Sequence, residues 1–188
     1  MKRILTAVAA LALVATTAVP AFAGMLDDIR GRNVVRIGVS LGGEPIGFRD
    51  EQNNPVGYDV DVANMIAQKL GVPVEFTDVS GDARISMLVS GQLDIVVANT
   101  SATLERAKSV NFTIPYNRAG LRIIVQADSG ITDLAGLAGK KIVVGRGTTG
   151  ETFIKTAVPT AELVYVDQFA PDGVLQLQQK RVDAAIED

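Results

Sequence analysis

The sequence predicts an α/β fold with parallel sheets, in two units. Short apolar runs alternate with segments whose apolar residues recur at helical spacing, a pattern typical of βαβ units. This alternation of expected strands and helices is interrupted once, by an extended stretch at residues 120–126, and then resumes. We therefore expect one lobe at residues 24–119, a hinge crossover at 120–126 and a partial second lobe at 127–188.

Strands and helices alternate in the first unit. The expected strands are short apolar runs, at residues 34–40, 74–79 and 94–98. The expected helices begin at capping residues and show helical periodicity, at residues 59–70, 82–90 and 103–108. The glycine-rich segment 41–57 is expected to be a loop.

The second unit repeats the alternation and stops on a strand. We expect a helical turn at 134–137, helices at 149–157 and 171–179, and strands at 141–145, 163–166 and 182–186. A parallel strand without a covering helix would leave apolar surface and an open edge. The expectation is therefore that the chain is C-terminally incomplete, with a naturally short protein as the alternative.

The first 23 residues have the pattern of an export signal. Lys2 and Arg3 precede an apolar run at 4–19, and Ala21-Phe22-Ala23 is a small-x-small cleavage pattern. We expect residues 1–23 to be a cleavable signal peptide, with a retained membrane anchor as the alternative.

Composition excludes several kinds of function. The chain contains neither cysteine nor histidine, which excludes the usual zinc sites and the Ser-His and Cys-His hydrolytic pairs. A net charge of −3 without a basic cluster argues against a nucleic-acid surface. We expect no metal and no cofactor, although an enzyme that uses a carboxylate or a lysine remains possible.

The start of the helix at 59–70 is the most distinctive segment. Gly57 allows a turn, Asp59 is expected to cap the first N–H groups, and Asp61 adds negative charge to the first turn. Apolar residues then recur at helical spacing, and Gly71 is expected to end the helix.

This segment resembles the sequence hallmark of the periplasmic solute-binding proteins of the polar amino-acid family, family 3. The hallmark is glycine, an aromatic residue, an acid, an apolar residue and an acid, as in residues 57–61. The likeness continues in order along the chain, at residues 90–94, 100–107, 111–116, 137–144, 147–150 and 181–185. It implies the two-lobed type II periplasmic-binding fold, with the second lobe and the return to the first lobe incomplete here.

The resemblance also implies a function. It predicts a monomeric periplasmic subunit of an ABC transporter that binds a polar amino acid between two closing lobes and presents it to a membrane permease. No catalysis is expected. The alternatives are a periplasmic dehydratase-like enzyme on the same fold, a ligand-sensing domain of a receptor, and a fragment that binds nothing.

The resemblance assigns the backbone groups of the ligand to particular residues. Arg106, Ser101 and Thr149 would bind the ligand carboxylate, since a guanidinium and the N-terminus of a helix both favour an anion. Asp188 and Asn99 would bind the ammonium group. The alternatives are a surface arginine at 106, a solvated acid at 188 and a turn residue at 99.

The ligand side chain is not predicted. Aromatic residues make up 5% of the chain and tryptophan is absent, so an aromatic sandwich around the ligand is doubtful. Glu44 would favour a cationic side chain, whereas Arg84 or Arg146 would favour an acidic one. The alternative for each of these three charges, and the more common situation for such residues, is a solvated loop charge.

Overall fold

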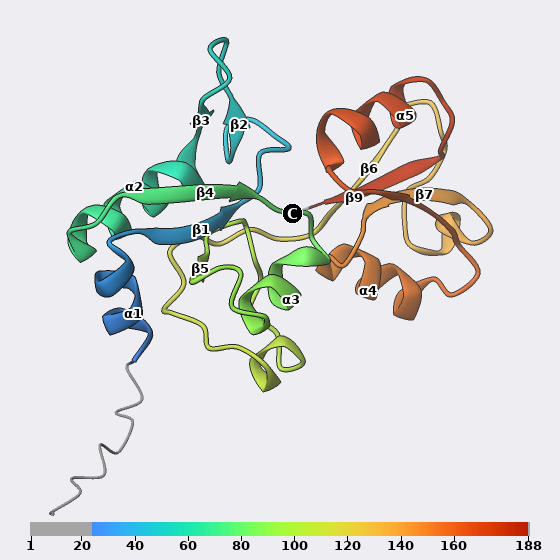
Figure 1. The fold of residues 1–188 in the computed structure, drawn as a ribbon. Coiled ribbons are helices and arrows are strands. Elements are labelled where there is room, and N and C mark those ends of the chain that lie inside the picture. Colours follow the sequence, from blue (N-terminus) through green and yellow to red (C-terminus); the bar gives the residue numbers. More distant parts are fainter. Residues whose placement is uncertain (1–23, 188) are drawn as a thin grey trace, which may run out of the picture.

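The computed structural model of this 188-residue chain describes residues 24–187. The predicted signal peptide at 1–23 and Asp188 lie outside the described residues. Two α/β lobes are present, each built on its own sheet, and the carboxyl ends of their parallel strands point toward one another (Figure 1). The predicted α/β, two-lobed fold is confirmed.

The first lobe contains a three-stranded parallel sheet in the order β4-β1-β5, formed by Val74–Asp78, Val35–Val39 and Ile95–Val96. Helix α2 (Tyr58–Leu70) buries Val60, Ala63 and Ala67 against β1. Helix α3 (Ala83–Val89) lies on the other side of the sheet, and α1 (Met25–Arg32) precedes β1 (Figure 1). Because successive side chains of a strand point to opposite faces, β1 supplies the core under α2 with alternate residues.

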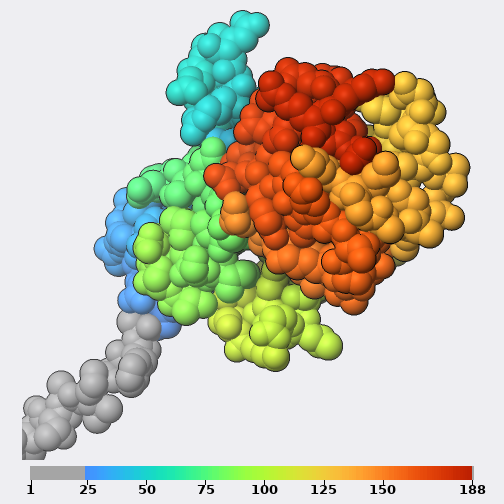
Figure 2. All heavy atoms as spheres, turned by 90° about the vertical axis from the view of Figure 1, so that its right-hand side faces the viewer, coloured from blue at the N-terminus to red at the C-terminus, as the bar shows by residue number. Residues whose placement is uncertain are grey.

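A hairpin lies within the predicted loop 41–57. Strands β2 (Phe48–Arg49) and β3 (Pro55–Val56) pair in antiparallel fashion, and the hairpin projects from the surface (Figure 2). At its tip the Asp50 carboxylate accepts hydrogen bonds from the backbone N–H groups of Asn54 and Gln52, at 2.7 and 3.0 Å. The loop assignment was wrong here because strands of two residues are too short to show a period.

The second lobe contains a four-stranded sheet in the order β6-β9-β7-β8, formed by Arg122–Val125, Ala184–Glu187, Lys141–Gly145 and Glu162–Val166. Strands β7, β8 and β9 are parallel and β6 is antiparallel to β9. Helices α4 (Thr149–Ala157) and α5 (Val174–Gln178) each pack on alternate residues of β7, through Ile154 and Leu177. Strand β6 lies inside the predicted crossover 120–126, so this segment is also an edge strand of the second sheet.

Shorter helical segments connect these elements. The predicted helix at 103–108 is a 3₁₀ turn, η1 (Arg106–Lys108), whose N-cap position is Glu105 and not the predicted Thr103. The Thr103 hydroxyl still accepts from the Arg106 N–H, at 3.2 Å. The predicted turn at 134–137 is η2 (Ala135–Leu137). The predicted helix at 171–179 consists of a π-type turn, η3 (Phe169–Gly173), followed by α5.

The predicted cap of α2 was wrong. Gly57 occupies the N-cap position with φ of 119°, and the Asp59 carboxylate accepts from residues outside the helix instead. An added Cβ at Gly57 would lie 2.7 Å from the carbonyl oxygen of Ile46, so this turn requires glycine. Gly71 does end the helix in the left-handed conformation, with φ of 73°.

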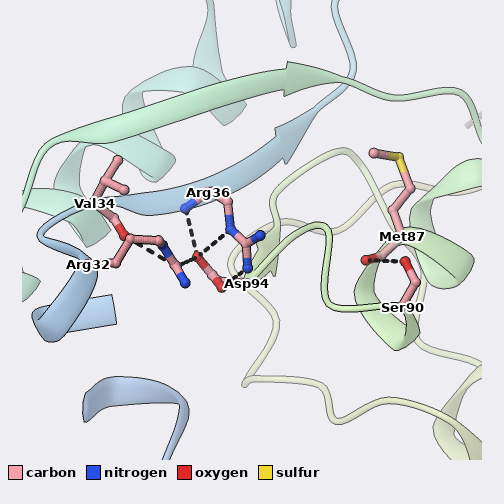
Figure 3. A network of polar contacts seen from close by, with 6 residues as sticks. All are labelled: Arg32, Val34, Arg36, Met87, Ser90 and Asp94. Carbon is pink, nitrogen blue, oxygen red and sulfur yellow. Dashed lines mark hydrogen bonds and ion pairs between the residues drawn. The ribbon is translucent and has the colours of Figure 1, made fainter. Parts of the chain in front are cut away.

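An ion-pair cluster around a buried carboxylate joins α1, β1 and the start of β5 at the amino-terminal edge of the first sheet. The Asp94 carboxylate accepts from the side chain and the backbone N–H of Arg36, both at 2.8 Å, and from the Arg32 guanidinium (Figure 3). Only 6% of the Asp94 side chain is exposed. This edge lies opposite the one that faces the second lobe, so the cluster is structural.

Within residues 24–187, none of the helices has the length and apolar character needed to span a bilayer.

Candidate ligand-binding site

A small cavity of about 30 Å³ lies between the two lobes, where the strands of both sheets end. Both lobes contribute to its lining, which consists of Arg84, Asn99, Ser101, Arg106, Thr148, Thr149 and Glu187. Because the carboxyl ends of parallel strands collect polar ligands, this edge is the expected position for a site in such a fold. Five of the residues predicted from sequence therefore lie together.

Arg106 contacts both lobes. Its Nη1 donates to the carbonyl oxygen of Ser101 at 2.7 Å, and its Nη2 donates to the carbonyl oxygen of Gly147 at 2.9 Å. A guanidinium has five N–H donors in a fixed fork, which matches the two oxygens of a carboxylate. Arg106 is half-buried at the cavity, so the surface-arginine alternative does not describe its position.

The N-terminus of α4 faces Arg106 from the second lobe. Thr148 is the N-cap, and its hydroxyl oxygen accepts from the Glu151 N–H at 3.3 Å. The Glu151 carboxylate accepts in turn from the Gly147 N–H at 2.7 Å, which completes a reciprocal capping arrangement. Thr149 begins the helix, where the N–H groups and the helix dipole favour an anion.

Hydrogen bonds at this turn stabilise the ionised form of the Glu151 carboxyl group. Burial would raise the pKa of its carboxyl group, but hydrogen bonds from Lys155, Gly147 and Tyr165 outweigh burial, so the pKa lies below its ordinary value. Glu151 is therefore an anion at neutral pH and keeps the helix start ordered.

The turn at Asn99 is hydrogen-bonded to the buried side chain of Asp59. Asn99 has φ of 43°, and its N–H donates to Asp59 Oδ2 at 2.7 Å. Arg84 Nη1 approaches the carbonyl oxygen of Asn99 at 3.4 Å. Burial raises the pKa of the Asp59 carboxyl group, against the opposing effects of hydrogen bonds from Tyr116 and Asn99 and of the Arg84 charge.

Two predicted pocket residues lie elsewhere. Glu44 is exposed in the turn before β2. The Arg146 guanidinium stacks 4.5 Å from the ring centroid of Tyr165 and lies 3.8 Å from Asp167, at a larger open hollow of about 420 Å³ on the second lobe. That hollow mixes both charge signs and is separate from the cavity between the lobes, so the structure does not bring Glu44 or Arg146 to Arg106. Asp188 lies outside the described residues.

Two lining residues were missed by the sequence analysis. Glu187 lies at the carboxyl end of β9, and this position next to a predicted strand end was the available signal. Thr148 sits in the glycine-containing turn before α4, where a threonine preceding an acid by three residues is a recognisable capping pattern. Glu187 brings a carboxylate to the cavity, next to the donors that suit an anion.

Glycines allow the lobes to meet closely. An added Cβ at Gly147, whose φ is 72°, would lie 2.6 Å from the Cα of Asp82 in the first lobe. An added Cβ at Gly81 would lie 2.3 Å from the carbonyl oxygen of Arg146. The segments around α3 and α4 are in contact in the space-filling view (Figure 2). The arrangement described is therefore a closed one.

Comparison with known proteins agrees with this architecture. Residues 35–188 match the bacterial extracellular solute-binding proteins, family 3. The chain belongs to this family. Among its relatives, the arginine-binding extracellular protein ArtP of Bacillus subtilis is 33% identical, over 83% of this chain and 61% of that protein. The L-cystine-binding protein TcyJ of Escherichia coli is 28% identical, over 100% of this chain and 71% of that protein.

Among solved structures, a mutant of arginine-bound ArgBP from T. maritima is similar, with a TM-score of 0.81 and 34% identity. The match covers 87% of this chain and 76% of that one. This chain thus spans between three fifths and four fifths of the length of each of these three proteins.

Proposed function

We propose that this family 3 protein binds a polar amino acid between its lobes and presents it to the membrane permease of an ABC transporter. The observation that carries the proposal is the meeting of three groups at one cavity: the Arg106 guanidinium, the N-terminus of α4 and the Glu187 carboxylate. An α-amino acid has one anionic and one cationic group at fixed separation. The guanidinium and the helix N-terminus complement its carboxylate, and the Glu187 carboxylate complements its ammonium group.

The roles follow from this chemistry. Arg106, Ser101 and Thr149 would bind the carboxylate, with Thr148 fixing the start of α4. Asn99, Glu187 and Asp188 would surround the ammonium group. Arg84, the predicted pocket residue that lines the cavity, would then face the ligand side chain.

Ligand access requires the lobes to separate. A cavity of about 30 Å³ holds little more than one water molecule, which is far too small for an amino acid. Separation breaks the bond between Arg106 and the Gly147 carbonyl, and the ligand carboxylate would take over that donor. Because the ligand then contacts both lobes only when they close on it, it would shift the equilibrium toward a closed state.

The proposal includes the organisation inferred from sequence. Residues 24–119 and 127–188 would form the lobes, with 120–126 as the connecting segment. The protein would act as a monomer in the periplasm after removal of residues 1–23. ArtP is named for arginine and TcyJ for cystine, and this supports a polar amino acid as the ligand proposed for this chain.

The test is a thermal-shift panel of the twenty amino acids and L-cystine on the purified chain. A ligand that binds only the folded state stabilises it and so raises the melting temperature. The stabilisation is about 2.7 kcal/mol when the ligand concentration is one hundred times Kd. At least one polar amino acid should give a saturable shift, and calorimetry should give a stoichiometry of one. Failure of every amino acid would contradict the proposal.

Glu44, the acid named for the dehydratase-like alternative, is exposed in a turn and does not line the cavity, so its position does not support that alternative. Prolonged incubation of the chain with the amino acid that it binds, followed by NMR, distinguishes the two functions. A binding protein leaves its ligand chemically unchanged, whereas an enzyme converts it.

A further inference from the structure

We propose that Asp59 is a positioning residue for the ligand site, which it shapes by holding the turn at Asn99 and the segment that leads to the second lobe. The inference rests on the proposed function, and it gives the distinctive helix start a role that is neither capping nor ligand contact.

The Asp59 carboxylate accepts from two residues that are distant in sequence. It is 1% exposed in the first turn of α2. Oδ2 accepts from the backbone N–H of Asn99 at 2.7 Å, and Oδ1 accepts from the Tyr116 hydroxyl at 3.0 Å. One side chain therefore connects α2, the turn that follows β5 and the segment before β6.

Helix formation does not account for this carboxylate. Gly57 starts the helix, and Asp61, exposed on the same turn, supplies negative charge at its N-terminus. A buried carboxylate is costly unless hydrogen-bonded, and an apolar residue would fill the same space without that cost. What Asp59 adds is the pair of acceptors, and both serve residues outside the helix.

The first acceptor shapes the cavity lining. A left-handed conformation is unfavourable for residues other than glycine, and asparagine tolerates it best. At φ of 43° the Asn99 N–H points to Asp59, while its carbonyl oxygen receives Arg84. Asn99 and Arg84 both line the cavity, so relaxation of this turn would move two ligand-facing residues together.

The second acceptor fixes the path toward the second lobe. Burial and the neighbouring Asp59 carboxylate raise the pKa of Tyr116 well above its ordinary value, so its hydroxyl remains a donor at all physiological pH values. Its ring stacks on Tyr58, 6.1 Å between centroids, and the Tyr58 hydroxyl donates to the Tyr116 carbonyl oxygen at 3.1 Å. The same carboxylate thus joins the cavity turn to the connection between the lobes.

The experiment compares three substitutions by calorimetric affinity for the amino acid of the panel that the unaltered chain binds most tightly. Asp59→Leu keeps the side-chain size and removes both acceptors, so affinity should fall tenfold or more. Asp59→Asn can still accept from the Asn99 N–H and donate to the Tyr116 oxygen, so it should stay within about threefold of the unaltered chain. Asp61→Asn, on the same turn, is the matched control and should leave affinity unchanged.

A second readout distinguishes positioning from stability. The amide proton of Asn99 should resonate far downfield in the unaltered chain and in Asp59→Asn, and should move upfield in Asp59→Leu. If Asp59→Leu does not fold, Tyr116→Phe removes one of the two bonds and should lower affinity about threefold with a folded spectrum.

The outcomes are separable. Unchanged affinity in folded Asp59→Leu, or in folded Tyr116→Phe where the leucine variant does not fold, overturns the inference and leaves the proposed function intact. An Asn99 amide that does not respond to Asp59→Leu also overturns it. An unaltered chain that binds no amino acid overturns both.

Discussion

Arg106 and Gly147 connect the two lobes directly: the guanidinium Nη2 of the first donates to the carbonyl oxygen of the second, at 2.9 Å. The same guanidinium holds the carbonyl of Ser101 in its own lobe through Nη1, at 2.7 Å. Its orientation is thus fixed from both sides of the cavity. The bond to Ser101 lies within the first lobe and does not depend on closure, so a carboxylate that arrives between separated lobes would still meet an aligned guanidinium, which lowers the entropic cost of binding.

Removing the Arg106 guanidinium should greatly weaken ligand binding. A charge-assisted bidentate pair contributes about 1.5–3 kcal/mol per hydrogen bond, so Arg106→Ala should weaken affinity at least a hundredfold. Arg106→Lys keeps the charge and loses the fork, and should retain part of the affinity. Calorimetric titration of each variant with the amino acid selected by the panel measures the loss.

The control is Lys108→Ala, in the same 3₁₀ turn, where the lysine side chain is 69% exposed and pairs with Glu105. It should bind normally. Without ligand, Arg106→Ala should melt within about 2–4 °C of the unaltered chain, the shift expected for 1 kcal/mol in a domain of this size. A much larger drop would show that Arg106 is mainly structural.

Gly147→Ala should impair closure more than folding. Alanine at φ of 72° carries a backbone cost of about 1–2 kcal/mol, and its Cβ would also clash with Asp82 across the interface. Affinity should fall more than tenfold, and small-angle scattering should show a larger radius of gyration.

Gly139→Ala is the matched control for this effect. Gly139 has φ of 68°, and within the described part of the chain an added Cβ there would meet no atom closer than 4 Å. It should share the loss of stability and keep its affinity. Equal losses of affinity in both variants would assign the effect to backbone strain alone.

The regular elements could be predicted because burial dictates their sequence. Strand β7 is a continuous apolar run buried on both faces, and α2 has an apolar stripe at helical spacing that ends at Gly71. The predicted bounds of both elements therefore agree with the structure to within one residue. The β2–β3 hairpin was missed because its strands are two residues long. Asp59 was misassigned because a short acid at a helix start usually caps it, and only the fold brings Asn99 and Tyr116 to its carboxylate.

The candidate site could be predicted in part for the same reason. Arg106 and Thr149 sit in local patterns that indicate anion binding, and Asn99 follows a strand. Glu44 and Arg146 were named by charge alone, and charge does not say which way a loop turns. The stacking of Arg146 on Tyr165 depends on a neighbouring strand that the local sequence does not reveal.

Gln168 should contribute to closure without touching the ligand. It follows β8 in the second lobe, accepts from the Ser40 hydroxyl and donates to Asp78 Oδ1, both at 3.2 Å, at the ends of β1 and β4. Gln168→Ala removes both bonds, each worth about 1 kcal/mol, and should weaken affinity roughly thirtyfold, mainly through faster dissociation. Stopped-flow release of the ligand measures this rate, and exposed Gln178→Ala is the control. An unchanged dissociation rate would exclude a role in closure.

Asp94 should govern part of the acid stability of the first lobe. Burial of its carboxyl group would raise its pKa, but hydrogen bonds from the Arg36 side chain and backbone and from Arg32 outweigh burial, so the pKa lies below its ordinary value. A carboxyl group with a lowered folded-state pKa stabilises the fold above its unfolded pKa of about 3.9, and this contribution disappears as the pH falls through the folded-state value.

Asp94→Asn should therefore lower the free energy of unfolding at pH 7 by about 2 kcal/mol, because it leaves two partly exposed arginines without their shared acceptor. It should also flatten the loss of stability below about pH 4, because the group that titrates there is gone. Urea unfolding at pH 7, 5 and 3 measures both effects. Asp128→Asn is the control: its exposed pair with Lys180 should contribute little. A variant that loses stability equally at all three pH values would show that Asp94 acts through packing and not through its charge.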